Sequence, residues 1–457
     1  MIPTAILYLA AMLIFIIVWF SFVKRPIYEA LFLAFLLLVA MTGTWGEALS
    51  YVRGALSTSL LYSMIVFVAM SQLLSHTGVI DSCVYLILSL FGRIPGGAGY
   101  ASIIASAFMG ALYGSGPGNV IATGVITIPA MKKSGFPPEL AANVESVSSY
   151  MGNMIPPSSN IVGALGAYTA YCAALGVGAQ VTTGQFWVIL WGIALYFIAQ
   201  RMLMLWCFCR FYRVRPMERA ALPSVRETLR TGWRGLLLPV IILVPFLFDA
   251  VCGDTFITAR LGKAGASAFS GSLLFFIAGI AAIYTVLIAR DRASVTLSAI
   301  LELFASKMKS LVGPIAACLA GYMIGELFAD IGATAELEAY LQALNLPLWG
   351  LALLIPLATA FLGMIIPGSS QVVIFGPVFI SAFAAAGLSP VLAAAMLPCI
   401  CGTMCGITPP LALGMYAGMS IAESDFKKTL YNDLWWVAGQ YVLEVILLLG
   451  VLPVIGL

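Results

Sequence analysis

Charged side chains are scarce in this chain. Of its 457 residues, 9% are Asp, Glu, Lys or Arg and 62% are hydrophobic. A soluble protein of this length needs far more charge on its surface, so the composition excludes a soluble enzyme and predicts an integral membrane protein. The net charge of +3 gives no reason to expect nucleic acid as a partner. The basic residues serve better as markers of membrane topology.

The residue types that build most catalytic and metal centres are also rare. The chain has one histidine, His76, and its nine cysteines form neither a CxxC pair nor a disulfide framework. Cys399, Cys401 and Cys405 lie in an apolar stretch, where a free cysteine packs as a small hydrophobe. Because no nucleophile, base or metal-ligand grouping occurs at membrane depth, a membrane enzyme is the least favoured class.

Long apolar runs predict transmembrane helices. They cover residues near 4–23, 27–46, 55–76, 184–208, 236–252, 266–289, 312–330 and 434–456. The first run has no basic residues before it and no small-residue cleavage site after it, so we predict a retained helix and not a signal peptide. Two mixed stretches, 80–92 and 294–309, are expected to lie along the membrane interface as arms.

The central feature is the run Gly-Ser-Gly-Pro-Gly-Asn from Gly114 to Asn119, with apolar sequence on both sides. Each flank, 101–112 and 120–131, is shorter than the roughly 20 residues that a helix needs to cross a bilayer. Two short helices that meet at such a tip predict a re-entrant hairpin. Non-helical backbone at this depth is tolerated only where it is buried in protein or lines a polar cavity. A second tip of the same kind runs from Pro367 to Ser370.

The two hairpins belong to an internal repeat. Pro156-Pro157 precedes Pro409-Pro410 by 253 positions, and Gly110 precedes Gly363 by the same number. A constant offset predicts two units, roughly 50–175 and 304–425. Each unit would contain a helix, an interfacial segment, a hairpin and a transmembrane helix broken at the Pro-Pro pair.

We predict that the two units are inverted. An odd number of predicted crossings separates 55–76 from 312–330, so these helices run in opposite directions. Lys132-Lys133 and the arginines between 201 and 234 mark the cytoplasmic side, whereas the matching loop of the second unit, Ala385-Ala386, is uncharged and predicted to be periplasmic. Both chain termini are then periplasmic.

Inverted repeats with broken helices are typical of secondary transporters, which bind ligands near mid-membrane. Half-helix N-termini offer N–H groups to an anion, and freed carbonyl and hydroxyl oxygens can hold a sodium ion. The predicted substrate-binding residues lie at the two tips and breaks: Ser115, Asn119, Ser158, Ser159, Asn160, Ser369, Ser370 and Thr408. The predicted ligands of two or more sodium ions come from the same turns: Gly114, Ser115, Gly152, Pro156, Gly363, Pro367, Cys405, Gly406 and Thr408. The alternative is that these groups satisfy one another at a bend.

Glu145 is a charged residue inside a predicted membrane segment, where a charge is costly and faces a partner or a cavity. Two roles are open: tuning of ion coupling, or a hydrogen bond that orients the broken helix. Leu397 occupies the matching position of the second unit, which disfavours a symmetric ion site. Asp249, Glu326 and Glu444 lie near predicted helix ends or the interface and are expected to be solvated.

At these residues the sequence resembles the large membrane subunit (permease, M) of tripartite ATP-independent periplasmic (TRAP) transporters, in the wider ion-transporter superfamily. The similar elements are Gly114-Ser115-Gly116, Ile128-Pro129-Ala130-Met131-Lys132-Lys133-Ser134-Gly135, Ile155-Pro156-Pro157-Ser158, Gly363-Met364-Ile365-Ile366-Pro367 and Gly406-Ile407-Thr408-Pro409-Pro410. Pro117-Gly118 departs from the usual tip. The segment at Glu145 is closer to the branch that uses TAXI-type binding proteins.

The resemblance implies an all-α polytopic membrane protein with an inverted repeat, two re-entrant hairpins and two broken transmembrane helices, working as an elevator. It implies sodium-coupled uptake of a small organic acid, such as a dicarboxylate, across the bacterial inner membrane. Its partners would be a small membrane subunit (Q type) and a periplasmic substrate-binding protein (P or TAXI type). The expected division is 1–96 scaffold and first arm, 97–176 and 347–425 the two halves of the transport domain, 177–346 scaffold and second arm, and 426–457 the last helix.

Two other transporter classes stay open. A stand-alone carrier of the same superfamily would move carboxylates without a binding protein. A channel would need a continuous pore and would show no coupling between fluxes.

Overall fold

The apolar runs fold into helices in the computed structural model. It describes residues 4–23, 25–113, 116–156, 158–178, 180–217, 222–289, 291–363, 367–408 and 412–457. In chain order the elements are α1 (Thr4–Val18), η1 (Trp19–Val23), α2 (Ile27–Thr42), α3 (Ala48–Ser57), α4 (Ser59–His76), α5 (Val79–Phe91), α6 (Gly97–Tyr113), α7 (Gly116–Lys133), α8 (Pro138–Tyr150), η2 (Met151–Asn153), α9 (Ser159–Ala174), α10 (Thr183–Tyr212), α11 (Val225–Gly232), α12 (Leu237–Cys252), η4 (Gly253–Ile257), α13 (Thr258–Ile288), η5 (Ala293–Val295), α14 (Leu297–Asp330), α15 (Ala333–Leu344), α16 (Leu348–Gly363), α17 (Gly368–Ala385), α18 (Pro390–Ile400), η6 (Met404–Gly406), α19 (Leu413–Ala422) and α20 (Phe426–Leu448).

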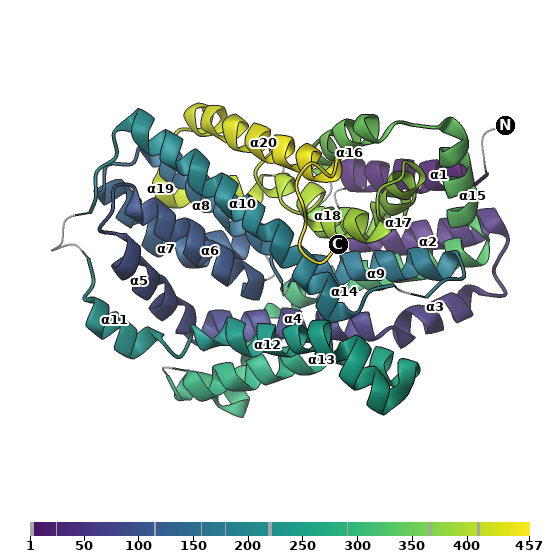
Figure 1. Cartoon of the computed structure of the whole chain (residues 1–457), viewed down its shortest axis with the longest axis horizontal. Helices are drawn as coiled ribbons and strands as arrows, with labels where there is room; N and C mark the ends of the chain where they lie inside the picture. Colours follow the sequence, from purple (N-terminus) through teal and green to yellow (C-terminus); the bar gives the residue numbers. More distant parts are fainter. Residues whose placement is uncertain are drawn as a thin grey trace.

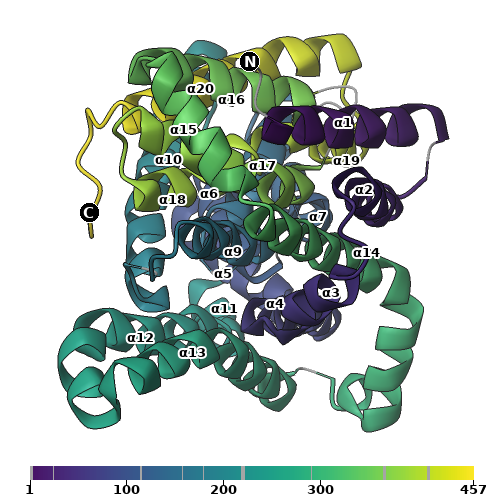
Figure 2. The same cartoon turned by 90° about the vertical axis from the view of Figure 1, so that its right-hand side faces the viewer.

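Apolar side chains gather the helices into two cores. The larger core joins α6 to α10 with α18 and α20, and these helices lie across the centre of the molecule (Figure 1). The smaller core joins α1, α2, α3 and α14, with Ile374 and Phe375 of α17 reaching into it. The pair α12 and α13 forms a layer below these helices, packs on α10 and α4, and contributes its inward side chains to the larger core (Figure 2).

Several helices have the length and composition of membrane spans. Among the described residues, Thr183–Tyr212, Ala268–Ile288 and Gly368–Ala385 meet both criteria. The helices α11 and α12, bent by 52° at their junction, make a fourth if they count as one span. Shorter apolar helices, including α1, α2 and α16, accompany them.

The structure places a helix on each side of both predicted tips. The limbs α6 and α7 have 17 and 18 residues, which makes them longer than the predicted flanks 101–112 and 120–131, and neither is among the helices that meet the criteria of a span. Gly116 and Pro117 open α7, because a proline in the first turn of a helix has no intrahelical N–H bond to lose. The limbs of the second hairpin, α16 and α17, have 16 and 18 residues.

Residues 294–309 are not a separate element, while their placement along the membrane interface stays a prediction. Most of them begin α14, a continuous helix of 34 residues. Thr296 caps its N-terminus by accepting a hydrogen bond from the backbone N–H of Ala299 at 3.3 Å. The matching part of the first half is divided, because Thr58 adopts an extended conformation between α3 and α4.

The last helix, α20, ends at Leu448, earlier than predicted. Gly450 has a left-handed φ of +69°, and Pro453 lacks the N–H that a continuing helix would need. The remaining apolar residues lie along α10. The Tyr196 hydroxyl donates to the carbonyl oxygen of Pro453 at 2.7 Å, and the missing side chain of Gly192 leaves room for Ile455.

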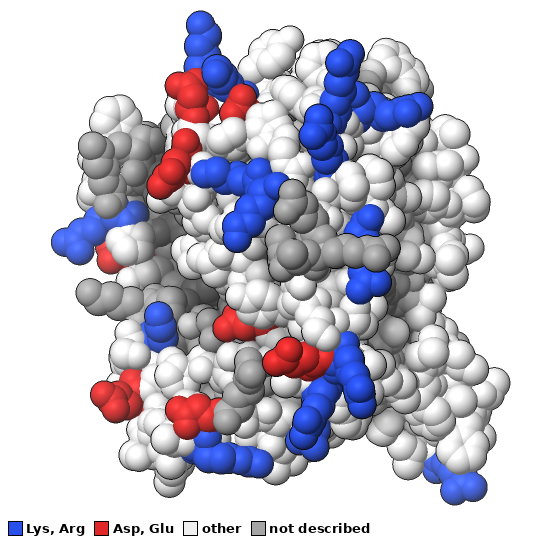
Figure 3. Space-filling view, turned by 90° about the vertical axis from the view of Figure 1, so that its left-hand side faces the viewer, with Lys and Arg blue, Asp and Glu red and all other residues white. Residues whose placement is uncertain are grey.

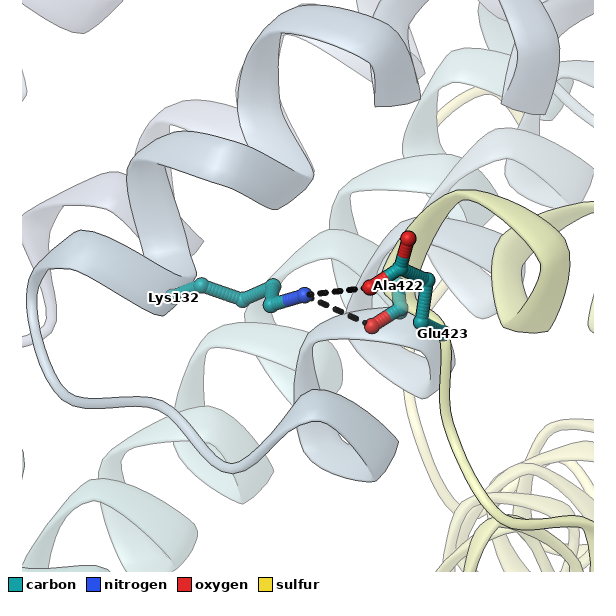
Figure 4. Close-up of polar contacts among 3 residues, drawn as sticks. All are labelled: Lys132, Ala422 and Glu423. Carbon is teal, nitrogen blue, oxygen red and sulfur yellow. Dashed lines mark hydrogen bonds and ion pairs between the residues drawn. The ribbon is translucent and has the colours of Figure 1, made fainter.

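Lysine and arginine side chains, with acidic ones among them, cover the end of the molecule that lies at the left of Figure 1 (Figure 3). Lys132 in the last turn of α7 donates from Nζ to the carbonyl oxygen of Ala422 at 2.8 Å and lies 4.0 Å from the Glu423 carboxylate (Figure 4). The lysine thereby gives a hydrogen-bond donor to a free carbonyl oxygen at the C-terminus of α19, and it joins the two halves of the chain at this end.

Candidate functional site

In the first half, the α6–α7 hairpin meets the turn between α8 and α9 through two glycines. A Cβ atom on Gly110 would lie 2.7 Å from Cα of Gly152. Beside them, Asn119 Nδ2 donates to the carbonyl oxygens of Ser106 at 2.8 Å and Ser149 at 3.3 Å. Asn119 is fully buried, and its Oδ1 has no hydrogen-bond partner. The amide nitrogen of Asn119 thus lies at the junction of hairpin and broken helix, and its buried oxygen remains available as an acceptor.

In the second half, the α16–α17 hairpin meets the turn between α18 and α19 in the same way. A Cβ atom on Gly363 would lie 2.8 Å from Cβ of Cys405 and 3.3 Å from Nε2 of Gln371. Gly363, Cys405 and Gln371 take the places of Gly110, Gly152 and Asn119. The Gly368 N–H donates to Cys405 Sγ at 3.2 Å, so the thiol receives the first N–H of α17.

The second limb of each hairpin also starts against the break of its own half. A Cβ on Gly116 would lie 2.6 Å from the Tyr150 ring, and one on Gly368 would lie 2.4 Å from the carbonyl oxygen of Cys401. Side chains at these positions would push the helix starts away from the breaks. Glycine is therefore required at both by close approach.

The two breaks contact each other through Asn153 and Tyr150. Asn153 Nδ2 donates to the Gly402 carbonyl oxygen at 2.5 Å. The Tyr150 ring is packed so tightly against Gly406 and Gly414 that a Cβ on either glycine would overlap it. Our sequence reasoning missed both residues. Asn153 could have been predicted as a site residue, because it is polar and lies within the predicted break. Tyr150 could not, because its contacts are with glycines some 250 positions away in the sequence.

The other predicted site residues lie at the same turns. Ser158 caps α9: its Oγ accepts from the N–H of Ile161 at 3.4 Å and donates to the Asn153 carbonyl at 2.8 Å. Thr408 is buried and donates to the Met404 carbonyl at 2.9 Å. Ser159, Asn160 and Ser370 are also buried, Pro156 lies in the first break, Pro367 precedes α17, Ser369 is half-buried in its first turn and Gly406 ends η6. Gly114 and Ser115 lie outside the described residues, as do Pro157, Pro409 and Pro410.

Glu145 is surrounded by hydroxyl groups from three helices. Ser102 and Ser106 of α6 donate to its carboxylate at 2.7 and 2.8 Å, and Ser149 of α8 donates at 2.9 Å. Thr123 and Thr127 of α7 donate as well. The carboxylate ties both hairpin limbs to α8, and its acceptor positions are taken by five protein donors. Of its two possible roles, the orienting hydrogen bond is the one that the geometry supports.

Two of the three acidic residues that we expected to be solvated are buried, so this prediction was wrong for them, whereas Glu326 is exposed. Asp249 is 1% exposed and accepts from the N–H of Gly184 at 2.9 Å and from Ser270 Oγ at 2.8 Å. Glu444 is fully buried and accepts from Gln440 Nε2 at 2.8 Å. Asp249 caps the N-terminus of α10, which explains its burial, since a carboxylate is favourable at that end of a helix.

The chemistry of these turns is that of neutral oxygen atoms and helix ends. Among the described residues no group of His, Cys, Asp and Glu has the arrangement of a transition-metal site. Carbonyl, amide and hydroxyl oxygens suit a hard cation. A hydroxyl such as that of Thr408 keeps lone pairs for a cation after donating its proton. The helix starts at Ser159 and Gly368 carry the positive end of a helix dipole, which favours an anion.

Comparison with known proteins identifies the chain. Residues 6–455 match the family described as tripartite ATP-independent periplasmic transporter, DctM component. The chain belongs to this family. The TRAP permease is 25% identical over 365 residues to the C4-dicarboxylate TRAP transporter large permease protein DctM of Rhodobacter capsulatus, covering 78% of this chain and 77% of that one. It is 25% identical over 400 residues to the sialic acid TRAP transporter large permease protein SiaM of Vibrio cholerae, covering 86% and 84%.

Solved structures of two transporters share the fold of this TRAP permease. The YdaH transporter of Alcanivorax borkumensis superposes with a TM-score of 0.62 at 18% identity, covering 90% of this chain and 88% of that one. MtrF of Neisseria gonorrhoeae, described as illuminating a class of antimetabolite efflux pumps, gives 0.58 at 15% identity, covering 90% and 83%. The chain is thus an all-helical membrane permease, and its family implies a small membrane subunit and a periplasmic binding protein as partners.

Proposed function

We propose that this permease takes up a small organic acid together with sodium, and that the two hairpin–break junctions form its ion and substrate sites. The observation that carries the proposal is the matched contact of Gly110, Gly152 and Asn119 in one half and Gly363, Cys405 and Gln371 in the other. Two equivalent junctions, each where a hairpin meets a broken helix, are what a transporter needs to hold coupling ions on both sides of one substrate.

The first sodium would bind at the turn of the first half. Asn119 Oδ1 supplies one buried oxygen without a partner, and the backbone near Gly114, Ser115, Gly152 and Pro156 would supply carbonyl oxygens. The second would bind at the turn that holds Gly363, Pro367, Cys405, Gly406 and Thr408. The Thr408 hydroxyl is buried there and keeps lone pairs for the ion.

The substrate carboxylate would lie between the two tips. Ser158, Ser159 and Asn160 stand at the start of α9, and Ser369 and Ser370 stand in the first turn of α17. Helix N-termini favour an anion through their free N–H groups and the helix dipole. The named substrates of the relatives, C4-dicarboxylate and sialic acid, are organic acids that such a site would accept.

The permease would work as an elevator built from an inverted repeat. We expect α6–α9 and α16–α19 to move as one body against a scaffold that contains α1–α4, α12–α15 and the arm α5. Packing supports adding α20 to the moving body, because α20 lies on α8, α16 and α18. Helix α10 lies on α6 and α18 but packs more extensively on α12 of the scaffold. The assignment of α20 differs from the division expected for 426–457.

Transport by the reconstituted complex tests the coupling. The permease with its small subunit is placed in liposomes, and uptake of labelled C4-dicarboxylate and sialic acid is measured with and without a sodium gradient and the binding protein. We expect uptake only with both. Thr408→Ala should need roughly 5- to 150-fold more sodium, since a lost ligand or hydrogen bond costs about 1–3 kcal/mol. Thr285→Ala, which removes a buried hydroxyl bonded within α13, is the matched control.

Uptake without sodium would refute the coupling. Uptake without any binding protein would favour the stand-alone carrier.

Labelling with an impermeant thiol reagent tests the inverted repeat. Lys133→Cys and Ala386→Cys should label from opposite sides of the membrane, with Lys133→Cys on the cytoplasmic side. The background must lack Cys207, which is exposed. Labelling of both positions from one side would refute the inversion and the periplasmic placement of the termini.

A further inference from the structure

A buried polar network connects α10 and α20 to the break of the second half. Arg201 of α10 is 1% exposed, and its guanidinium donates to Gln200 Oε1 at 2.5 Å and to Oε1 of Gln440 on α20. Gln440 is fully buried and uses both ends of its amide. Its Nε2 donates to Glu444 Oε1 at 2.8 Å and to the hydroxyl of Thr403.

Thr403 places the end of this network at the break itself. Its hydroxyl, which accepts from Gln440, donates to the carbonyl oxygen of Cys399 in α18 at 2.7 Å. Gly402, directly before Thr403, accepts a hydrogen bond from Asn153 of the first half. Cys405, two residues after Thr403, receives the first N–H of α17. Movement of Thr403 would therefore move the contact between the two breaks and the start of the second hairpin.

The charged groups of the network indicate that it fixes an orientation and does not only fill space. Removing two opposite charges from water costs several kcal/mol per ion before any attraction is counted, and an apolar group of similar volume is often as stable. Here the Gln440 amide stands between Arg201 and Glu444, and each charge fixes one end of it. The amide therefore has one orientation, in which its N–H groups point to Glu444 and Thr403.

The first half orients the matching position by different means. Tyr150 precedes Thr403 by 253 positions, and its ring is held by close packing against Gly116, Gly406 and Gly414. Hydrogen bonds through Gln440 thus hold the backbone of the second break in place, whereas the packing of an aromatic ring holds the backbone of the first.

We propose that Gln440, held by Arg201 and Glu444, is a positioning residue that orients Thr403 and with it the backbone from Gly402 to Gly406. This backbone is the turn at which the second sodium is proposed to bind, so the inference rests on the proposed function. None of the three network residues touches the ion; they act through Thr403.

Sodium-dependent thermal stability tests the network without a known substrate. The melting temperature of the purified complex is measured against NaCl concentration, with choline chloride holding ionic strength constant. An ion that binds only the folded protein raises the melting temperature as its concentration passes the dissociation constant. Thr403→Val and Gln440→Leu should each move the half-maximal sodium concentration up by roughly 5- to 30-fold, the effect of a lost hydrogen bond.

Two controls separate positioning from general stability. Thr403→Ser keeps the hydroxyl and should restore the wild-type sodium curve. Thr285→Val removes a hydroxyl that bonds only within α13 and should leave the sodium curve unchanged. If Gln440→Leu gives no folded protein, Thr403→Val decides alone, because it keeps the side-chain volume and leaves the amide in place.

The outcomes are distinct. A wild-type protein whose melting temperature ignores sodium would overturn the sodium coupling and this inference with it. A wild-type protein that responds to sodium, together with wild-type curves for the folded Thr403→Val and Gln440→Leu variants, would overturn the network inference alone.

Discussion

The first hairpin is fastened to its broken helix by a carboxylate, and the second by an apolar side chain at the matching position. A Cβ on Gly124 would lie 3.1 Å from Cγ of Glu145, and one on Gly376 would lie 3.1 Å from Cδ1 of Leu397. The steric contact is thus the same in both halves. Only Glu145 also receives hydroxyl groups from both limbs of its hairpin.

This difference in chemistry accompanies a difference in packing. The limbs α6 and α7 pack closely on each other and on α8, whereas α16 makes few contacts with α17 and α18. Hydrogen bonds are directional and fix a limb at one angle, while an apolar contact keeps its strength over a range of angles. We therefore expect the first hairpin to move as a rigid body with α8 and the second hairpin to open more easily.

Placing a carboxylate in the second half, at the position that matches Glu145, should reduce the stability of the folded protein most. Leu397→Glu places a carboxylate at a fully buried position in the apolar core of the second half. The cost of roughly 3–5 kcal/mol for an uncompensated charge should abolish the folded protein, as judged by yield and elution on size-exclusion chromatography. Leu397→Met, which conserves volume, should elute as wild type. A well-folded Leu397→Glu protein would mean that the second half also offers donors.

The converse change in the first half should be smaller. Glu145→Leu leaves five hydroxyl groups without their acceptor, but Thr123 and Thr127 also lie within hydrogen-bonding distance of carbonyl oxygens of their own helix. We expect a loss of about 2–4 kcal/mol, seen as a lower melting temperature in detergent. Glu145→Gln should lose less, because one oxygen acceptor remains. An unchanged melting temperature in Glu145→Leu would show that the hydroxyl groups do not hold the hairpin.

Alanine substitutions at the first residues of α7 and α17 should lower the melting temperature by the next largest amount. Gly368→Ala forces a methyl group against a backbone oxygen, and Gly116→Ala forces one against the ring of Tyr150. Each should cost roughly 1–3 kcal/mol, and Gly368→Ala should cost more because the backbone has less freedom to shift than a ring. Gly279→Ala in α13 meets no atom within 4 Å and is the control. Equal melting temperatures for all three variants would contradict the close approach.

The smallest effect is expected at the charged end. Lys132→Ala removes the bond to Ala422 and the 4.0 Å contact with Glu423, whose side chain is 85% exposed. Exposed pairs contribute about 1 kcal/mol or less, so the melting temperature should fall only slightly and the fall should shrink in high salt. A large fall would indicate that this bond fastens the halves together.

The sequence was enough to predict the helical fold and both hairpins, because apolar runs and glycine-rich tips are local patterns. The continuity of residues 297–309 with the rest of α14 was not predictable, because the mixed composition of 294–309 suggested a segment separate from the apolar run 312–330. The burial of Asp249 depends on partners on α10 and α13. The burial of Glu444 depends on Gln440 of its own helix, which in turn bonds to Arg201 of α10. The position of Tyr150 between two breaks likewise arises only when residues of the two halves come together.

The apolar tail after Leu448 limits how another domain can be fused to Leu457. A reporter domain joined to Leu457 would begin beside Ile189 in the second turn of α10, because Gly456 packs there. It would not extend in line with α20. A short linker would pull Ile455 out of its place over Gly192, so C-terminal tags need several flexible residues before the reporter begins.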